Sequence, residues 1–365
     1  MNNFKKHIFN SFNSDIWNYL KNVKKPILIY GMGNGADKII SVLEKNNITY
    51  DDVFASDGFV RGHSYRGKIV LSYTQAVEKY KDFIILLSFG TKLNDVMQKI
   101  YELNTIHELY APDVPVCEGE IFDEKFFDTH IEELEKSRNL LYDEKSKAIF
   151  DDIIRFKLTG KLEYLKSTQE DEQLLDSILP YDNYKSFLDL GAYNGDTIKK
   201  YRQLCPNLKQ IYAFEPDFRN FKKLLSYKEE NSNIALNLFN YAAWNENTTL
   251  KFSASGNRNS SGAGNISHQT KFVLVEARRP DSIVDNVDFI KYDVEGAELE
   301  ALIGSEKIIK VYSPDLLVSM YHKSEDLFVI PSLVNDINPN YKLFLRRLPY
   351  IPAWDLNLYA VKKQN

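Results

Sequence analysis

The stretch at residues 186–217, SFLDLGAYNGDTIKKYRQLCPNLKQIYAFEPD, constrains the fold more than any other part of the sequence. A short apolar run at 187–190 predicts a strand, and the glycines Gly191 and Gly195 predict a tight turn into a helix. The next apolar run ends on Glu215, at about the twenty-residue spacing at which an acid reaches the ribose hydroxyls of a nucleoside. The stretch therefore predicts a nucleoside pocket at the carboxyl end of a parallel strand.

Acidic residues on both sides of the glycine turn indicate which nucleoside cofactor it binds. The loop lacks the G-x-G-x-x-G pattern that cradles a pyrophosphate, and its flanking carboxylates, Asp189 and Asp196, would repel one. They would attract the ammonium and sulfonium of S-adenosylmethionine, so we expect this methyl donor. Asp189 has an alternative role, which is to pin the loop by hydrogen bonds. With Glu215 on the ribose, the residues expected around this cofactor are Asp189, Gly191, Ala192, Tyr193, Asn194, Gly195, Asp196, Thr197 and Pro216.

Four segments of the second half of the chain resemble one enzyme family. LDLGAYNGDT and AFEPD, then IKYDVEGAELEAL at residues 290–302 and MYHKSEDLFVIP at 320–331, are similar to the FkbM family of S-adenosylmethionine-dependent methyltransferases. The resemblance implies a class I methyltransferase fold and O-methylation of sugars or secondary-metabolite hydroxyls. It also implies that the end of a strand at 234–244 flanks the adenine, through Ala242, Ala243 and Trp244; a core position is the alternative for Trp244.

The whole chain is expected to be an α/β protein of two domains, because 365 residues exceed the usual size of one. Residues 1–115 alternate strands and helices and predict a small parallel Rossmann-like domain. Residues 116–185 show the three- and four-residue apolar spacing of amphipathic helices and predict a helical connector. Residues 186–365 then form the methyltransferase sheet, which a hairpin near the end of the chain is expected to close.

A second glycine turn, Gly31, Gly33 and Gly35, follows the first predicted strand, and Asp57 follows the second. This half resembles small nucleotide-sugar-binding domains of bacterial sugar-modifying enzymes, in which Asp57 would meet a ribose. The alternative is that the glycines only permit close packing of strand and helix.

The connector is expected to cover the cofactor pocket, with Gly160 ending one of its helices. Three tyrosines, Tyr164, Tyr181 and Tyr184, are candidates to line the pocket. In the second domain, the segment ASGNRNSSGAGN at 254–265 predicts either a mobile loop over the acceptor site or a plain hairpin turn.

Methyl transfer to a sugar hydroxyl needs a positioned acceptor and a route for its proton. We expect His322, at the end of a core strand, to act as general base, and Asp293 to hydrogen-bond the acceptor or shape the methyl donor's site. Glu295 is a further candidate for cofactor contact. A structural role is the alternative for His322, and a divalent cation held by Asp293, Glu295 and His322 is another, although metal-free catalysis is the default. For Glu295 and Glu298, the alternative is that they satisfy free N–H groups at the start of a helix.

The composition limits the classes of partner that the chain is expected to bind. A net charge of −5 without a basic stripe argues against nucleic acid, and no apolar run reaches the length of a membrane span. Two distant cysteines, Cys117 and Cys205, favour a reducing cytoplasm. The expected partner is a sugar or nucleotide sugar, and a homo-oligomer is possible. The competing functions are a nucleotide-sugar oxidoreductase that uses NAD, for which no recognisable Tyr-x-x-x-Lys catalytic pair lies near a plausible nicotinamide site, and a non-catalytic scaffold.

Overall fold

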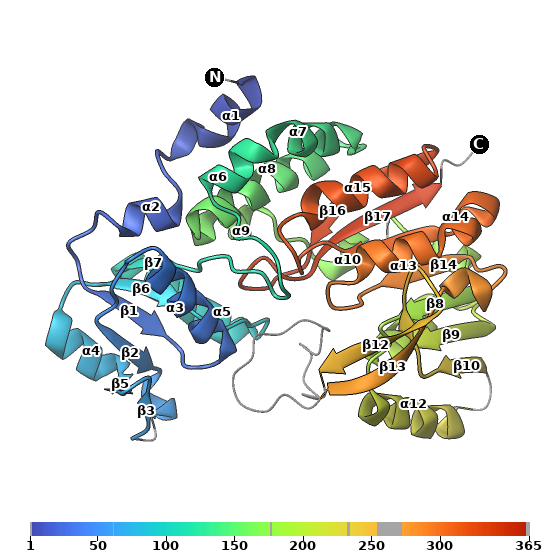
Figure 1. Ribbon diagram of the computed structural model, residues 1–365, viewed down its shortest axis with the longest axis horizontal. Helices are drawn as coiled ribbons and strands as arrows, with labels where there is room; N and C mark the ends of the chain where they lie inside the picture. The colour runs from blue at the N-terminus through green and yellow to red at the C-terminus, as the bar shows by residue number, and fades with distance from the viewer. Residues whose placement is uncertain (1, 61, 176, 232–233, 254–271, 363–365) are drawn as a thin grey trace.

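The computed structural model describes residues 2–60, 62–175, 177–231, 234–253 and 272–362. Most strands lie in two sheets placed side by side, with a layer of helices above and between them (Figure 1). The glycine- and serine-rich segment at 254–265 lies outside the described residues.

The first sheet lies within residues 27–110 and has five parallel strands in the order β5-β2-β1-β6-β7. Its central strands are buried along their whole length, as expected of parallel strands covered on both faces. The predicted alternation of strands and helices is confirmed, but the strand expected at 68–71 is divided between a small hairpin and the sheet edge. The elements are β1 (Ile27–Tyr30), α3 (Asn34–Lys45), β2 (Asp52–Ala55), β3 (Ser64–Tyr65), β4 (Lys68–Ile69), β5 (Leu71–Ser72), α4 (Tyr73–Tyr80), β6 (Ile84–Leu87), α5 (Asn94–Ile106) and β7 (Glu108–Tyr110).

Close packing accounts for two of the three glycines after β1. A Cβ on Gly31, whose φ is +110°, would lie 2.7 Å from Oγ of Ser88, and a Cβ on Gly35 would lie 2.1 Å from the Ser88 carbonyl oxygen. The carboxylate of Asp57, expected on a ribose, accepts hydrogen bonds from the backbone N–H and the hydroxyl of Thr74 at the start of α4. These contacts support the packing interpretation of this turn.

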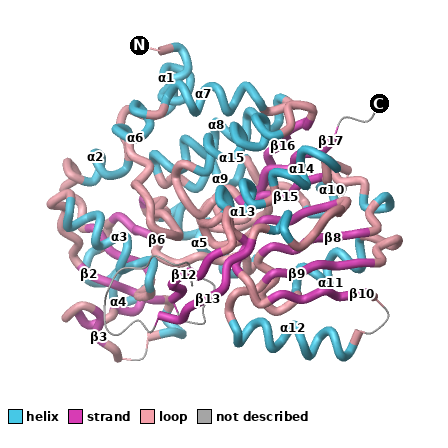
Figure 2. The backbone as a smooth tube through the Cα atoms, turned by 45° about the vertical axis from the view of Figure 1, so that its right-hand side comes forward, coloured by secondary structure: helices cyan, strands magenta, loops and turns pink. Residues whose placement is uncertain are grey.

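The second sheet has seven strands in the order β10-β9-β8-β14-β15-β17-β16, with the last two antiparallel to their neighbours (Figure 2). This is the parallel sheet closed by a hairpin that the family resemblance implies. Its elements are β8 (Ser186–Leu190), α11 (Asp196–Leu204), β9 (Gln210–Phe214), α12 (Phe218–Glu230), β10 (Ala235–Phe239), β14 (Phe289–Tyr292), α13 (Glu298–Gly304), α14 (Glu306–Tyr312), β15 (Asp315–Ser319), α15 (Asp326–Ile337), β16 (Tyr341–Arg347) and β17 (Leu356–Lys362).

Two expected strands of this half were wrong in extent. The segment at 234–244 forms two strands, because the side chain of Asn240 turns back and donates to the carbonyl oxygens of Glu215 and Pro216. Its second part joins a separate three-stranded sheet of β11 (Ala242–Ala243), β12 (Thr248–Ser253) and β13 (Phe272–Arg278). Residues 283–292 read as one apolar strand in the sequence, but only Phe289–Tyr292 form one, as β14.

The helical layer connects the two sheets and packs on the closing hairpin. The backbone N–H of Leu345 in β16 donates to Oγ of Ser146, and Arg346 forms an ion pair with Asp143. Gly160 ends the longest of these helices with a φ of +67°, as predicted. The helices are α6 (Glu124–Thr129), α7 (Ile131–Leu140), α8 (Glu144–Thr159), α9 (Leu162–Ser167) and α10 (Glu172–Leu175), and α1 (Asn3–Ile8) and α2 (Ile16–Leu20) precede the first sheet. The domain boundaries at residues 115 and 185 stay a prediction.

Among the described residues, no helix has both the length and the apolar character required to cross a bilayer.

Candidate active site

The loop after β8 is shaped by contacts that only glycine permits. Gly191 has a φ of +84°, and a Cβ there would lie 1.9 Å from the carbonyl oxygen of Asp293 in the loop after β14. Gly195, with a φ of +86°, precedes α11, where the predicted helix begins. The ends of two adjacent parallel strands are thereby brought into direct contact, at the edge where open α/β sheets bind ligands.

Glu215 lies at the end of β9 and holds this loop. Its carboxylate accepts the backbone N–H of Tyr193 at 2.7 Å and that of Asp217 at 2.8 Å, and the residue is only 5% exposed. Burial raises the pKa of Glu215 to about 7, although both N–H groups oppose this rise. A carboxylate has further lone pairs, so Glu215 can still accept hydrogen bonds from ribose hydroxyls.

A cavity of about 940 Å³ opens at this edge of the sheet. It is large enough for a nucleoside cofactor together with an acceptor. Eleven of the residues singled out from the sequence line it: Gly191, Tyr193, Asp196, Thr197, Glu215, Pro216, Ala242, Ala243, Trp244, Asp293 and Glu295.

Five other candidates lie behind the cavity wall instead of lining it. Ala192 is buried under the loop, and Gly195 turns the chain into α11. Asn194 uses its side-chain oxygen to accept the backbone N–H of Asp196. These three residues shape the loop, and their direct contact with the cofactor stays a prediction. The remaining two are Asp189 and His322.

Asp189 is fully buried, and neither of its oxygens makes a hydrogen bond with the described residues. The proposal that it pins the loop by hydrogen bonds is therefore wrong. Its neighbour is the ammonium of Lys291 at 3.8 Å, and burial raises the pKa of Asp189 to about 7. The contact of Asp189 with the cofactor stays a prediction.

The tyrosines expected to line the main cavity lie elsewhere. Tyr184 is buried and donates to Oδ2 of Asp315, and the Tyr164 hydroxyl bonds with that of Ser11. Tyr181 lines a smaller adjoining cavity of about 110 Å³. The connector instead reaches the main cavity through residues 116–118 and Glu172.

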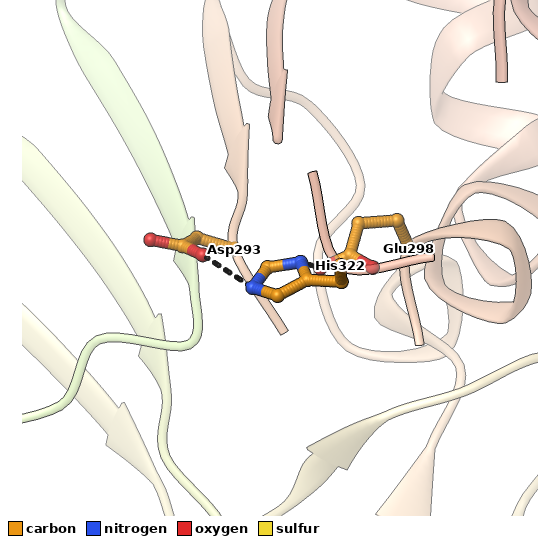
Figure 3. Close-up of side chains that lie close together, drawn as sticks. All are labelled: Asp293, Glu298 and His322. Atoms are coloured by element: carbon orange, nitrogen blue, oxygen red, sulfur yellow. Dashed lines mark ion pairs between the residues drawn. The ribbon is translucent and has the colours of Figure 1, made fainter. Parts of the chain in front are cut away.

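The loops after β14 and β15 bring three carboxylates around one histidine. His322 lies between Asp293 and Glu298 (Figure 3). Its Nδ1 is 3.0 Å from Oε1 of Glu298, and its Nε2 is 3.7 Å from Oδ1 of Asp293 and 3.5 Å from Oε2 of Glu295. Asp293 and Glu295 line the cavity, whereas the histidine behind them is fully buried.

This environment opposes a role for His322 as a free general base. Burial alone would lower the pKa of its imidazole, but the carboxylates of Glu298, Asp293 and Glu295 raise it to about 10. The ring would carry a proton at neutral pH, and it does not reach the cavity. Glu298 has the partly structural role expected of it, because its carboxylate accepts the backbone N–H groups of Val294 and Gly296 just before α13.

The far wall of the cavity was not found from the sequence. Lys92 comes from the loop between β6 and α5 of the first sheet, and Tyr350 and Trp354 come from the loop between β16 and β17. The backbones of Thr91 and Ile351 exchange hydrogen bonds, and a Cβ on Gly90 would lie 2.7 Å from the Trp354 ring. Local patterns carry no signal for contacts between segments so far apart; only the aromatic and proline content of residues 350–354 marked this loop as unusual.

Comparison with known proteins agrees with this geometry. Residues 189–348 match the family described as the methyltransferase FkbM domain. The crystal structure of an FkbM methyltransferase from Methylobacillus flagellatus superposes with a TM-score of 0.67 at 19% identity, over 99% of this chain and 94% of that chain. This superposition shows that the two proteins share a fold along their whole length.

More distant structures align with about half of the chain. Fibrillarin from Aeropyrum pernix, with S-adenosyl-L-methionine bound, matches 52% of this chain and 72% of its own at 17% identity and a TM-score of 0.33. A precorrin-6y C5,15-methyltransferase from Geobacter metallireducens matches 52% and 87% at 11% identity and a TM-score of 0.34. The search of curated proteins found no match.

The family match spans the loop after β8, Glu215 and the carboxylates after β14, which are the elements that build the cavity. S-adenosylmethionine is the cofactor of this family, and a buried acid beside a glycine loop suits its ribose. The chain therefore carries a methyltransferase domain of the FkbM family and is an S-adenosylmethionine-dependent methyltransferase.

Proposed function

We propose that this protein methylates a hydroxyl oxygen of a sugar, within a surface glycan or its nucleotide-linked precursor. The observation that carries the proposal is the continuity of the cavity. It extends from Glu215 past Asp293 to a wall of aromatic and basic side chains. Cofactor and acceptor can thus occupy neighbouring parts of one enclosed space.

The near part of the cavity suits the cofactor. Glu215 would accept the ribose hydroxyls, and the loop with Gly191 and Tyr193 would lie against the methionine portion. Asp196 and Asp293 add negative charge on the side where an ammonium and a sulfonium would lie. S-adenosylmethionine supplies an activated methyl group when bound.

Asp293 is the residue best placed to receive the acceptor hydroxyl. Its side chain is 31% exposed and lines the cavity between the cofactor part and the aromatic wall. Burial alone would raise the pKa of Asp293, but Lys291 and His322 lower it, so the carboxylate stays ionised at neutral pH. An ionised carboxylate accepts a hydrogen bond and fixes the direction of an oxygen lone pair.

The far wall supports a sugar or nucleotide-sugar acceptor. Tyr350 and Trp354 offer flat apolar faces with polar edges, which suit the mixed surface of a sugar ring. Lys92 and Lys323 would attract the phosphates of a nucleotide. A cytoplasmic site of action belongs to the same proposal, and its support is that neither Cys117 nor Cys205 is in a disulfide.

The proposal is tested by incubating the full chain with S-adenosylmethionine and a panel of nucleotide sugars, free sugars and non-sugar alcohols. We expect one nucleotide sugar to gain the mass of a methyl group, with loss of the product in Asp293→Asn. A control variant, Glu276→Gln, changes an exposed carboxylate on β13 and should retain activity. Methylation confined to non-sugar acceptors would overturn the sugar assignment.

A further inference from the structure

The side chains around His322 are of the types that bind divalent cations. We propose that Asp293, Glu295 and Nε2 of His322 bind a divalent cation at the cavity wall, with Glu298 orienting the imidazole. The role of the cation in fixing the acceptor oxygen rests on the proposed function, but its binding does not.

Nε2 of His322 lies close to one carboxylate oxygen of each of the other two proposed ligands. It is 3.5 Å from Oε2 of Glu295 and 3.7 Å from Oδ1 of Asp293. A cation about 2.1 Å from each ligand holds adjacent ligands about 3.0 to 3.4 Å apart. Shifts of a few tenths of an ångström would bring each carboxylate to this distance from Nε2. Donor atoms of Asp293 and His322, together with one of Glu298, all lie within 4.8 Å of one another.

The imidazole presents a nitrogen whose hydrogen-bonding capacity is unused. His322 is fully buried, and its Nε2 makes no hydrogen bond with the described residues. A buried polar atom without a hydrogen bond destabilises the folded state, and a bound ion would remove that cost. The carboxylates that face Nε2 are the two that line the cavity, so a cation between them would keep open coordination positions on the cavity side.

Glu298 occupies the position of an outer-shell carboxylate. It is 1% exposed, and its two oxygens are fixed by the backbone N–H groups of Val294 at 2.9 Å and Gly296 at 3.1 Å. Its Oε1 lies 3.0 Å from Nδ1 of His322. A carboxylate beside the other ring nitrogen is the usual companion of a metal-binding histidine. The cation would take the place of the Nε2 proton that the ring otherwise carries at neutral pH, while Nδ1–H continues to face Glu298.

The loop that carries Glu295 is held in a conformation that costs energy. Glu295 has a φ of +54°, which is unfavourable for a residue with a Cβ, and Gly296 follows at +94°. The Cys117 thiol donates to the carbonyl oxygen of Glu295 at 3.0 Å and leaves no room for a Cβ on Gly296. Strain of this kind is found at functional sites, where the surrounding structure maintains it.

Charge favours a cation at this place. The ammonium of Lys291 contacts Oδ2 of Asp293 at 3.2 Å, and Oδ1 faces the histidine and accepts a hydrogen bond from the Tyr321 hydroxyl at 3.3 Å. The carboxylates of Glu298, Asp293 and Glu295 all lie within 3.7 Å of the imidazole. Two carboxylates with one imidazole suit Mg²⁺, Mn²⁺ or Fe²⁺ better than a soft-ligand metal.

The test measures Mn²⁺ binding to the full chain after treatment with a chelator, without S-adenosylmethionine, by calorimetry and by the loss of the free-ion paramagnetic resonance signal. We expect one ion per chain. Glu295→Gln should weaken binding by at least tenfold, and Glu298→Gln by roughly 10- to 100-fold through the histidine's orientation. Glu118→Gln, which removes an exposed carboxylate elsewhere on the cavity rim, is the matched control and should bind as the wild type does.

Thermal unfolding with and without Mn²⁺ provides a second measurement, since an ion bound to the folded chain raises the midpoint. Equal Mn²⁺ affinity in Glu295→Gln and Glu118→Gln, or no binding to the wild type, would overturn the metal proposal. S-adenosylmethionine binding and sugar methylation are measured separately in the presence of chelator. If both persist there while Mn²⁺ fails to bind, the proposed function stands and only the metal inference is lost.

Discussion

Replacing Glu215 with glutamine tests the cofactor site most directly. The substitution keeps the side-chain volume in a position that is 5% exposed and removes the charge. The native carboxylate satisfies the backbone N–H groups of Tyr193 and Asp217, one on each oxygen. In Glu215→Gln the amide oxygen can accept a hydrogen bond from only one of these two N–H groups, and the NH₂ group, itself a donor, faces the other.

The expected loss of cofactor affinity follows from the hydrogen bonds to the ribose. A hydrogen bond to a charged group contributes about 1.5 to 3 kcal/mol. A loss of about 1.5 to 3 kcal/mol in binding free energy weakens cofactor binding roughly 10- to 150-fold. The unpaired backbone donor adds a separate cost of about 1 to 3 kcal/mol to the stability of the free protein.

Calorimetric titration with S-adenosylmethionine and with S-adenosylhomocysteine separates the causes. The two compounds share the ribose but differ in charge at sulfur, so a ribose contact predicts the same loss for both. Glu276→Gln, an exposed carboxylate on β13, serves as the control and should bind both compounds normally. Unchanged affinity of folded Glu215→Gln for both compounds would refute the assignment of Glu215 to the ribose.

Three further predictions concern the same region. Gly191→Ala should lower the free energy of unfolding, measured in urea, by more than about 2 kcal/mol. A positive φ alone costs about 1 to 2 kcal/mol, and the new Cβ would also lie 1.9 Å from a backbone carbonyl oxygen. The control is Gly58→Ala, whose new Cβ has no neighbour within 4 Å and should change stability little. Since burial raises the pKa of Glu215 from 4.5 to about 7, this group should lower folding stability as the pH rises from about 4.5 to 7, where only the folded chain keeps the proton, whereas cofactor affinity should rise between about pH 6 and 8 as the folded carboxyl ionises; both trends should be reduced in Glu215→Gln when followed by unfolding and by calorimetry at each pH. Tyr184→Phe should lower the unfolding free energy by about 1 to 2 kcal/mol, because it loses a hydrogen bond to a buried carboxylate, and should leave cofactor affinity unchanged. The control is Tyr142→Phe, which changes an exposed ring and should leave stability unchanged. Weaker cofactor binding in Tyr184→Phe would place this ring in the site.

Local patterns were enough to find the cofactor loop. The apolar run of β8, the glycines of the turn and the acid at the end of β9 are separated by short, fixed intervals, so their spacing in sequence determines their spacing in space. The same holds for the closing hairpin and for Gly160, whose positive φ ends α8. The match to a known family rests on these local segments.

Local spacing was misleading where a side chain changed the course of the backbone. The segment at 234–244 has the composition of one strand, but Asn240 bonds to the end of β9 and divides it. Asp189 has the sequence position of a loop ligand, yet its side chain is fully buried beside Lys291. The orientation of such residues depends on which neighbours fill the space around them.

By itself, the sequence determined the alternation of strands and helices, the glycine turn with its acid, and the family, because each depends on residues close together in the chain. Only the tertiary structure decided that His322 lies between Asp293 and Glu298, with the Cys117 thiol against the same loop. It also decided that Trp354 and the first sheet's end loop close the cavity. These contacts join segments that are distant in the chain, and their distances are set by the packing of the sheets and helices, which no local pattern encodes.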